Sequence, residues 1–253
     1  MHLEPARPTD RLLALASDFA GEVTHRIGRV IPLKEQFSAL TTEPVDDGRV
    51  TVAVVDADTL KARSIPLTVE GRPILRLFVK YNCCWDRGAD FLAVEASWFH
   101  VRLGDREKDE PLFRYEFVRR PDGLIPASHL QIHAHRDEFL YLLVAGDKGR
   151  PKVRQRKGEV PRMSVFHFPL GGHRFRPCIE DVLQALILEL GVDRVDGWRA
   201  AIEEGRESWR RTQLKAAVRD APTDAASVLT DLGWKVVPPD RETRDNLDRL
   251  RSF

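Results

Sequence analysis

Apolar side chains near the start of the chain recur every three or four residues, the spacing of one face of a helix. This pattern covers residues 10–30, where Asp10 is a suitable N-cap, and its apolar positions are Leu12, Leu15, Phe19, Val23 and Ile27. We therefore expect an amphipathic helix that packs on the rest of the fold.

From about residue 49 to residue 135 the apolar period changes from helical spacing to two, which indicates β-strands. The β-rich segments are VTVAVVD, SIPLTVEG, PILRLFVKYNCCW, DFLAVEASWFHVRLG, PLFRYEFVRR and SHLQIHAH. The connectors EGRP, DRG, GDREKDE and RPDG are short and turn-like. Because parallel strands need a longer crossover, the pattern predicts antiparallel pairing.

Helical spacing returns in the last third of the chain. Before it, residues 137–146 are expected to form a short helix and residues 163–170 a strand. Residues 176–191 predict a helix with Pro177 in its first turn and Gly191 at its end. Further helices are predicted by a stripe of Trp198, Ile202, Gly205 and Trp209, by a capped segment at 223–233 and by a charged tail.

These patterns predict an α+β fold: a mostly antiparallel twisted sheet, an N-terminal helix packed on it and a helical C-terminal extension. We expect one α+β domain over residues 1–192 that carries a histidine cluster, and the extension over residues 193–253.

Composition narrows the function only slightly. A net charge of +1 gives no global argument for nucleic-acid or membrane binding. The chain shows neither a secretory signal at its start nor an apolar run long enough to span a bilayer, so no membrane association is expected. Three cysteines, at positions 83, 84 and 178, form neither a disulfide framework nor a zinc motif, which favours a cytoplasmic location.

Five of the eight histidines lie between residues 129 and 173, and three of them alternate in HLQIHAH. On a strand, His129, His133 and His135 share one face with Gln131. In the neighbouring segment FRYEFV, Arg114 and Glu116 share a face, and Tyr115 lies on the opposite one. If the polar faces coincide, histidines, an arginine and a carboxylate gather on one side of the sheet.

Such a cluster fits three interpretations. Imidazoles near neutral pKa can exchange protons while an arginine stabilises developing negative charge, as a metal-free ribonuclease requires. His133 and His135, with His167 or His173, could instead bind a divalent transition metal. The third interpretation is a solvated strand face without chemistry. HAHRDE and HFPLGGH are similar to the two cupin motifs, but Glu138 and His173 come too early for their spacing.

Basic residues follow the histidines. A glycine turn in FPLGGHRFRP leads through His173, Arg174 and Arg176 to a helix N-terminus, which suits an anion. Residues 148–162 carry seven basic residues and one acid, among them Lys152, Arg154 and Arg156. The predicted phosphate-binding residues are Arg114, Lys152, Arg154, Arg156, Arg174 and Arg176.

Over roughly residues 112–189 the chain contains, in this order, FRYEF, a polar turn, the histidine strand, HFPLGGHRFRP and an EDVL helix. This order resembles the TumE-type toxins of prokaryotic toxin–antitoxin modules. Alternating histidines replace the adjacent pairs of that family. The resemblance implies a cytoplasmic protein that acts on nucleic acid and is held in check by a partner. It implies a working set of Arg114, Tyr115, His129, His133, His135, His167 and His173.

The leading hypothesis is a toxin-like or defence-type protein that cleaves RNA by metal-independent acid–base chemistry, without a cofactor. Its predicted catalytic residues are His129, His133, His135, His173 and Tyr115. RNA and a cognate antitoxin or other protein are the expected partners. One alternative is a metal-dependent, cupin-like enzyme that uses His133, His135 and His167. The other is a non-catalytic interaction module that binds its partner through Trp198 and Trp209.

Overall fold

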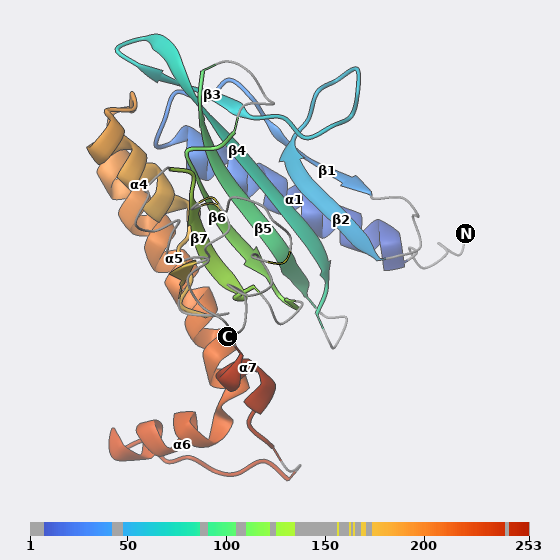
Figure 1. Ribbon diagram of the computed structural model, residues 1–253. Helices are drawn as coiled ribbons and strands as arrows, with labels where there is room; N and C mark the ends of the chain where they lie inside the picture. Colours follow the sequence, from blue (N-terminus) through green and yellow to red (C-terminus); the bar gives the residue numbers. More distant parts are fainter. Residues whose placement is uncertain are drawn as a thin grey trace.

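The computed structural model places one layer of helices against one face of a broad antiparallel sheet (Figure 1). It describes residues 8–41, 48–86, 91–104, 110–121, 125–134, 156, 162, 164, 168–170, 174–240 and 243–252. The predicted α+β class is confirmed.

The predicted helices and strands are mostly found where the periodicity placed them. The strands are β1 (Phe37–Thr41), β2 (Arg49–Val54), β3 (Ile65–Val69), β4 (Arg72–Trp85), β5 (Leu92–Leu103), β6 (Phe113–Val118), β7 (Ser128–Ile132) and β8 (Phe168–Pro169). The helices are α1 (Pro8–Gly28), α4 (Ile179–Leu190), α5 (Trp198–Asp220), α6 (Pro222–Asp231) and α7 (Leu247–Arg251). The sequence patterns did not predict β1.

The described strands form one sheet in the order β1-β2-β4-β5-β6-β7-β8, and β3 pairs with β4 beside that path. Every strand pair is antiparallel, as the short connectors predicted. A bulge in the β4–β5 pairing between Asn82 and Cys83 shifts the alternation at the start of β5. Glu95 therefore reaches Arg49 on β2, at 2.9 Å.

The hydrophobic core lies between one face of this sheet and helices α1, α4 and α5. Leu12 and Ile27 of α1, Leu183 of α4 and Ile202 of α5 join Leu77 and other strand residues in one buried cluster. In Figure 1, α1 crosses behind the sheet, and α4 and α5 stand beside β6 and β7. We call the sheet face toward the helices the inner face and the opposite one the outer face.

The ends of two helices differ in detail from the prediction. α1 begins at Pro8, so Asp10 lies in its first turn and is not the N-cap. Cys178 is the N-cap of α4, and Pro177 precedes the helix. The Cys178 backbone N–H donates to Asp181 Oδ2 at 3.0 Å, which satisfies one N-terminal donor. Gly191 ends α4 with a φ of 68°, as expected for a left-handed C-cap.

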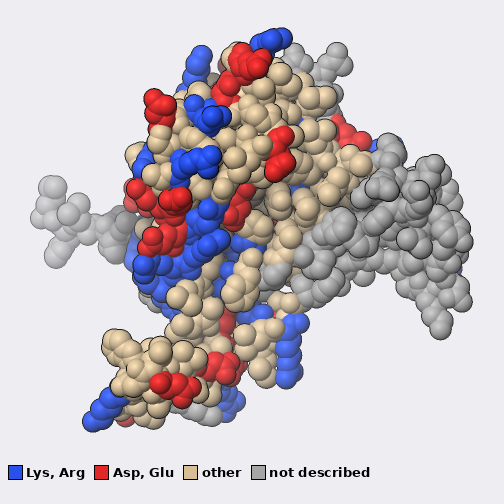
Figure 2. All heavy atoms as spheres, turned by 90° about the vertical axis from the view of Figure 1, so that its left-hand side faces the viewer, with Lys and Arg blue, Asp and Glu red and all other residues tan. Residues whose placement is uncertain are grey.

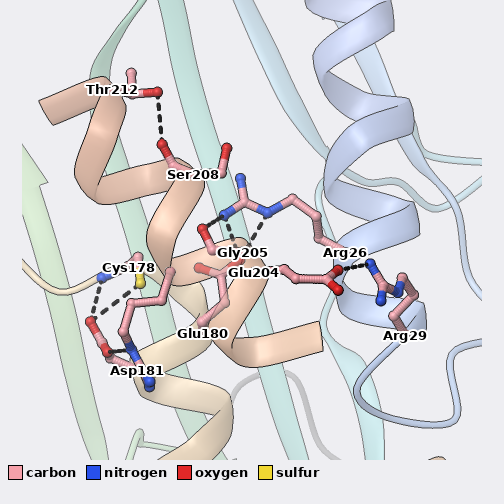
Figure 3. A network of polar contacts seen from close by, with 10 residues as sticks. Arg26, Arg29, Cys178, Glu180, Asp181, Glu204, Gly205, Ser208 and Thr212 are labelled. Carbon is pink, nitrogen blue, oxygen red and sulfur yellow. Dashed lines mark hydrogen bonds and ion pairs between the residues drawn. The ribbon is translucent and has the colours of Figure 1, made fainter. Parts of the chain in front are cut away.

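A buried ion pair joins three helices that are distant in sequence (Figure 3). Arg26 of α1 donates through Nε to Glu180 Oε1 of α4 at 2.8 Å, and through Nη2 to the Gly205 carbonyl of α5 at 2.9 Å. The Glu180 side chain is only 2% exposed. This contact fixes α4 and α5 relative to α1.

Burial decreases along the C-terminal helices. Trp198 and Ile202, near the start of α5, are in the buried core cluster, while no described residue of α6 or α7 is buried. Figure 1 shows α6 and α7 below the sheet. Trp198 is a core residue, which does not fit a partner-binding surface made of Trp198 and Trp209. None of the described helices is both long enough and apolar enough to cross a membrane.

Some predicted elements lie outside the described residues. These are the helix at 137–146 and nearly all of the basic segment at 148–162. The strand expected at 163–170 is described only in part, as β8.

Candidate functional site

The outer face of the sheet carries a polar cluster because of the strand register. Directly opposite residues of antiparallel strands share a face. One row across the sheet runs Lys80, Trp98, Glu116, His129, and the next runs Phe78, His100, Arg114, Gln131. The predicted coincidence of Arg114, Glu116 and His129 on one face is therefore observed.

Glu116 of β6 is the centre of this cluster. His100 Nε2 lies 2.8 Å from Glu116 Oε1, and Arg114 Nη1 lies 3.3 Å from the same oxygen. On the other side, His129 Nε2 lies 3.4 Å from Glu116 Oε2. A carboxylate only accepts hydrogen bonds, so the His100 Nε2–H donates to it. The lone pair of that neutral ring is then on Nδ1.

The surroundings shift the pKa values of both partners. Burial alone would raise the pKa of Glu116, but hydrogen bonds from His100 and His129 and the charge of Arg114 outweigh it and hold this pKa far below 4.5. Burial lowers the pKa of His100 below 6.5, and Glu116 only partly offsets this effect. Near neutral pH the pair is therefore a carboxylate and a neutral imidazole, whose tautomer the carboxylate fixes.

His129 has a different environment from His100. Its side chain is 2% exposed, and its Nδ1–H donates to the Pro126 carbonyl at 3.0 Å. The ring is thus held from both sides, by a backbone carbonyl and by Glu116. His129 can position Glu116, and its burial leaves almost none of the ring exposed.

A second histidine–carboxylate pair lies just beyond the end of β7. His133 Nδ1 is 2.9 Å from Glu110 Oε1, and Arg162 Nη1 is 3.4 Å from the same oxygen. Hydrogen bonding to His133 is the main cause that lowers the pKa of Glu110. The four-residue offset between His129 and His133 corresponds to about 13 Å along a strand. The two pairs are therefore separate sites on the sheet.

Three predicted site residues lie away from the outer face. Tyr115 is on the inner face, where its ring meets Phe113 edge-on at 5.8 Å. Arg174 pairs with Asp220 of α5 at 2.7 Å. Arg176 is buried on the inner side, its guanidinium 3.6 Å from the Phe117 ring centroid and 4.8 Å from that of Trp209. These two arginines anchor the α4 entry to α5 and the sheet, so the structure does not place them with the Glu116 cluster.

The remaining predicted residues cannot be placed in the cluster. His135, His167, His173, Lys152 and Arg154 lie outside the described residues, and Arg156 is described only as an exposed helical residue. Within the described ranges, no group of three or more His, Cys, Asp or Glu side chains is arranged to hold a metal ion. The metal alternative with His133, His135 and His167 stays a prediction, because two of its ligands lie outside those ranges.

The sequence patterns missed His100, Glu116 and Glu110 as site residues. The alternation in FRYEFV did place Glu116 beside Arg114, but His100 is far from the histidine cluster in sequence. Only the pairing of β5 with β6, which sets His100 opposite Arg114, brings it to Glu116. One signal for His100 was available: strand alternation places it on the same face as Trp98, two residues earlier.

The charge of the outer face differs from that of the helical side. Figure 2 shows acidic and basic side chains interspersed over the side formed by α4 and α5. On the outer face, the rows containing Phe78 and Trp98 and the neighbouring pair Arg76–Arg102 carry one acid, Glu116, beside the basic residues Arg76, Lys80, Arg102 and Arg114.

Comparisons of the chain with protein-family models, with curated proteins and with solved structures found no match.

Proposed function

We propose that this chain is a cytoplasmic, toxin-like protein that cleaves RNA without a metal, with the outer face of the sheet as its active surface. The observation that carries the proposal is the hydrogen bond between His100 and Glu116, with Arg114 on the same carboxylate oxygen. A neutral imidazole oriented by a carboxylate beside an arginine is a suitable set for phosphodiester cleavage.

His100 is the general base in this proposal. Its Nδ1 removes the proton from a ribose 2′-hydroxyl, and the 2′-oxygen attacks the adjacent phosphorus. The bond from phosphorus to the 5′-oxygen breaks, and that oxygen takes a proton from a water molecule. The hydroxide that remains takes the proton from His100 Nδ1, which restores the neutral base. The products are a 2′,3′-cyclic phosphate and a 5′-hydroxyl. Arg114 stabilises the charge on the phosphoryl oxygens, while Glu116 and His129 position His100 and Arg114.

The test is cleavage of an end-labelled single-stranded RNA in the presence of a chelator. The wild type is expected to release fragments with 2′,3′-cyclic phosphate ends and to leave DNA of the same sequence intact, since DNA lacks the 2′-hydroxyl. His100→Gln should lower the rate by about 10²–10⁴-fold, the usual contribution of general base catalysis. His25→Gln, which changes an exposed histidine of α1, is the matched control and should cleave like the wild type.

Three results would contradict the proposal. Intact RNA after prolonged incubation with the wild type would exclude the activity. Wild-type rates in His100→Gln would exclude the assigned base. Cleavage that disappears in chelator would favour the metal-dependent alternative at His133, His135 and His167.

The resemblance to TumE-type toxins adds a cellular expectation. Expression of the wild type should arrest the growth of a bacterial host, and His100→Gln should relieve the arrest. A cognate antitoxin would suppress the activity of the wild type when both are expressed together.

We also propose, as a second candidate, a partner-binding role for the C-terminal arm, residues 222–240. No described residue of α6 is buried, and Val228, Leu232 and Trp234 are 57%, 70% and 67% exposed. Such apolar exposure in one segment favours a protein contact. Trp234→Ser should weaken binding of a purified cognate antitoxin, and His100→Gln should leave it unchanged. Equal binding by both variants would remove the arm from consideration.

A further inference from the structure

Two aromatic side chains lie next to the Glu116 cluster on the outer face. Phe78 of β4 is directly opposite His100 of β5, with ring centroids 5.4 Å apart. Trp98 precedes His100 by two residues on the same face and is directly opposite Lys80. Phe78 and Trp98 are therefore diagonal neighbours on adjacent strands, and such neighbours are about 7–8 Å apart. Phe78 and Trp98 therefore form a pair of rings beside the proposed base.

Each ring is accompanied by a cation. Lys80 Nζ lies 5.2 Å from the Trp98 ring centroid, and the Arg102 guanidinium lies 5.8 Å from that of Phe78. Both rings are half-buried and neither is part of the hydrophobic core cluster. None of the described helices packs on this face, which distinguishes it from the inner face (Figure 1).

The charge of this surface indicates which class of ligand fits it. Glu116 is its one acidic side chain in these rows, and His100, Arg114 and His129 surround that carboxylate. The other charged side chains in these described rows, Lys80 and Arg114, and the neighbouring pair Arg76–Arg102 are basic. A polyanion with flat apolar groups at regular intervals matches cations beside aromatic faces, whereas an acidic peptide would leave the rings without stacking partners.

We propose that the outer face is a binding platform for single-stranded RNA, on which two successive bases stack on Trp98 and Phe78 while Lys80 and Arg102 contact the phosphates. This inference rests on the proposed function, because the same placement brings the phosphodiester beside the stacked bases to His100. Duplex RNA is excluded from this mode, since its bases are already stacked on one another.

Binding is measured separately from cleavage by using a fluorescein-labelled, 2′-O-methylated single-stranded RNA, which has no free 2′-hydroxyl to react. Fluorescence anisotropy with the wild-type chain should show binding that weakens steeply between about 50 and about 200 mM salt. Trp98→Leu and Phe78→Leu should each weaken it by ~5- to 150-fold, the range found for loss of one base–aromatic stack. Trp98→Phe should retain most of the affinity.

The matched control is Phe91→Leu. Phe91 is 61% exposed and has the Arg219 guanidinium 5.9 Å from its ring centroid, but it lies before β5 and outside the two rows. This variant should bind like the wild type. In case the leucine variants fail to fold, photo-crosslinking of the wild type to a 5-bromouridine RNA provides a second measurement, and peptides with Trp98 or Phe78 should carry the crosslink.

The outcomes separate the platform from the nuclease. Trp98-dependent binding without RNA cleavage would support the platform and overturn the nuclease. Cleavage with an unchanged KM in Trp98→Leu and Phe78→Leu would support the nuclease and overturn the platform. Absence of binding, equal binding of duplex and single-stranded RNA, or crosslinks confined to other peptides would overturn the platform.

Discussion

Glu180 of α4 lies where a side chain at position 205 of α5 would begin. A Cβ built on Gly205 would come within 2.4 Å of Glu180 Oε1 and 2.9 Å of its Cδ. Both atoms belong to a buried carboxylate that Arg26 holds in place, so the neighbour has little freedom to move. The close approach of α4 and α5 therefore requires glycine at position 205.

Gly205→Ala should destabilise the protein although alanine is the better helix former. Overpacking of a buried contact costs about 1–3 kcal/mol, which exceeds the gain of up to about 1 kcal/mol from helix propensity. Urea denaturation should show a lower free energy of unfolding. Gly21→Ala in α1, where nothing lies within 4 Å of the added Cβ, is the control and should be neutral or stabilising. Equal effects of the two substitutions would contradict this account of Gly205.

Arg26→Met should leave Glu180 as a buried carboxylate without its cation. Removal of one partner of a buried pair costs about 3–5 kcal/mol, and the lower part of this range is expected because the Arg26 side chain is 26% exposed. The double variant Arg26→Met, Glu180→Gln should recover part of the loss, since it also removes the charge. Urea denaturation of both variants measures this.

The neighbouring pair Arg29–Glu204 provides a matched control for the same experiment. Its side chains are 44% and 62% exposed, so solvent screens the interaction. Arg29→Met should change the free energy of unfolding by less than about 1 kcal/mol. A loss as large as that of Arg26→Met would mean that burial does not determine the strength of these pairs.

Glu116→Gln should reduce the loss of stability in acid. The pKa of Glu116 is lower in the folded chain than its ordinary 4.5. Its contribution to stability is therefore fully present above that pH and is lost as the pH falls through the folded-state pKa. Below pH 4.5 the free energy of unfolding of the wild type should fall more steeply than that of the variant. Glu110→Gln, at a 51% exposed carboxylate, should change this slope less.

The sequence predicted the sheet better than it predicted the site, for reasons visible at particular residues. Period-two alternation placed Arg114 and Glu116 on one face, because alternation is local to one strand. It could not place His100 opposite Arg114, because register is a property of two strands. Alternation alone would set Glu95 on the same face as Ser97, but the bulge after Asn82 turns Glu95 toward Arg49.

Burial along β7 also departs from the rule that apolar residues face the core. His129 and Gln131 are 1% and 4% exposed, whereas Leu130 and Ile132 are only half-buried. The His129 ring has polar contacts with Glu116 and with the Pro126 carbonyl, and the Gln131 side chain donates to the Ser164 carbonyl at 2.7 Å. Side-chain polarity therefore did not indicate which face of this strand is covered.

His100 should titrate below the ordinary imidazole pKa of 6.5, because burial disfavours its charged form more than Glu116 favours it. Chemical shifts of the ring protons as a function of pH measure this directly. In Glu116→Gln the midpoint of His100 should move lower still, because the carboxylate is the group that raises this pKa. If His100 is the base for RNA cleavage, the wild-type rate should fall as the pH drops through the same midpoint. An upward shift of the His100 midpoint in Glu116→Gln would contradict the hydrogen bond on which the proposed chemistry depends.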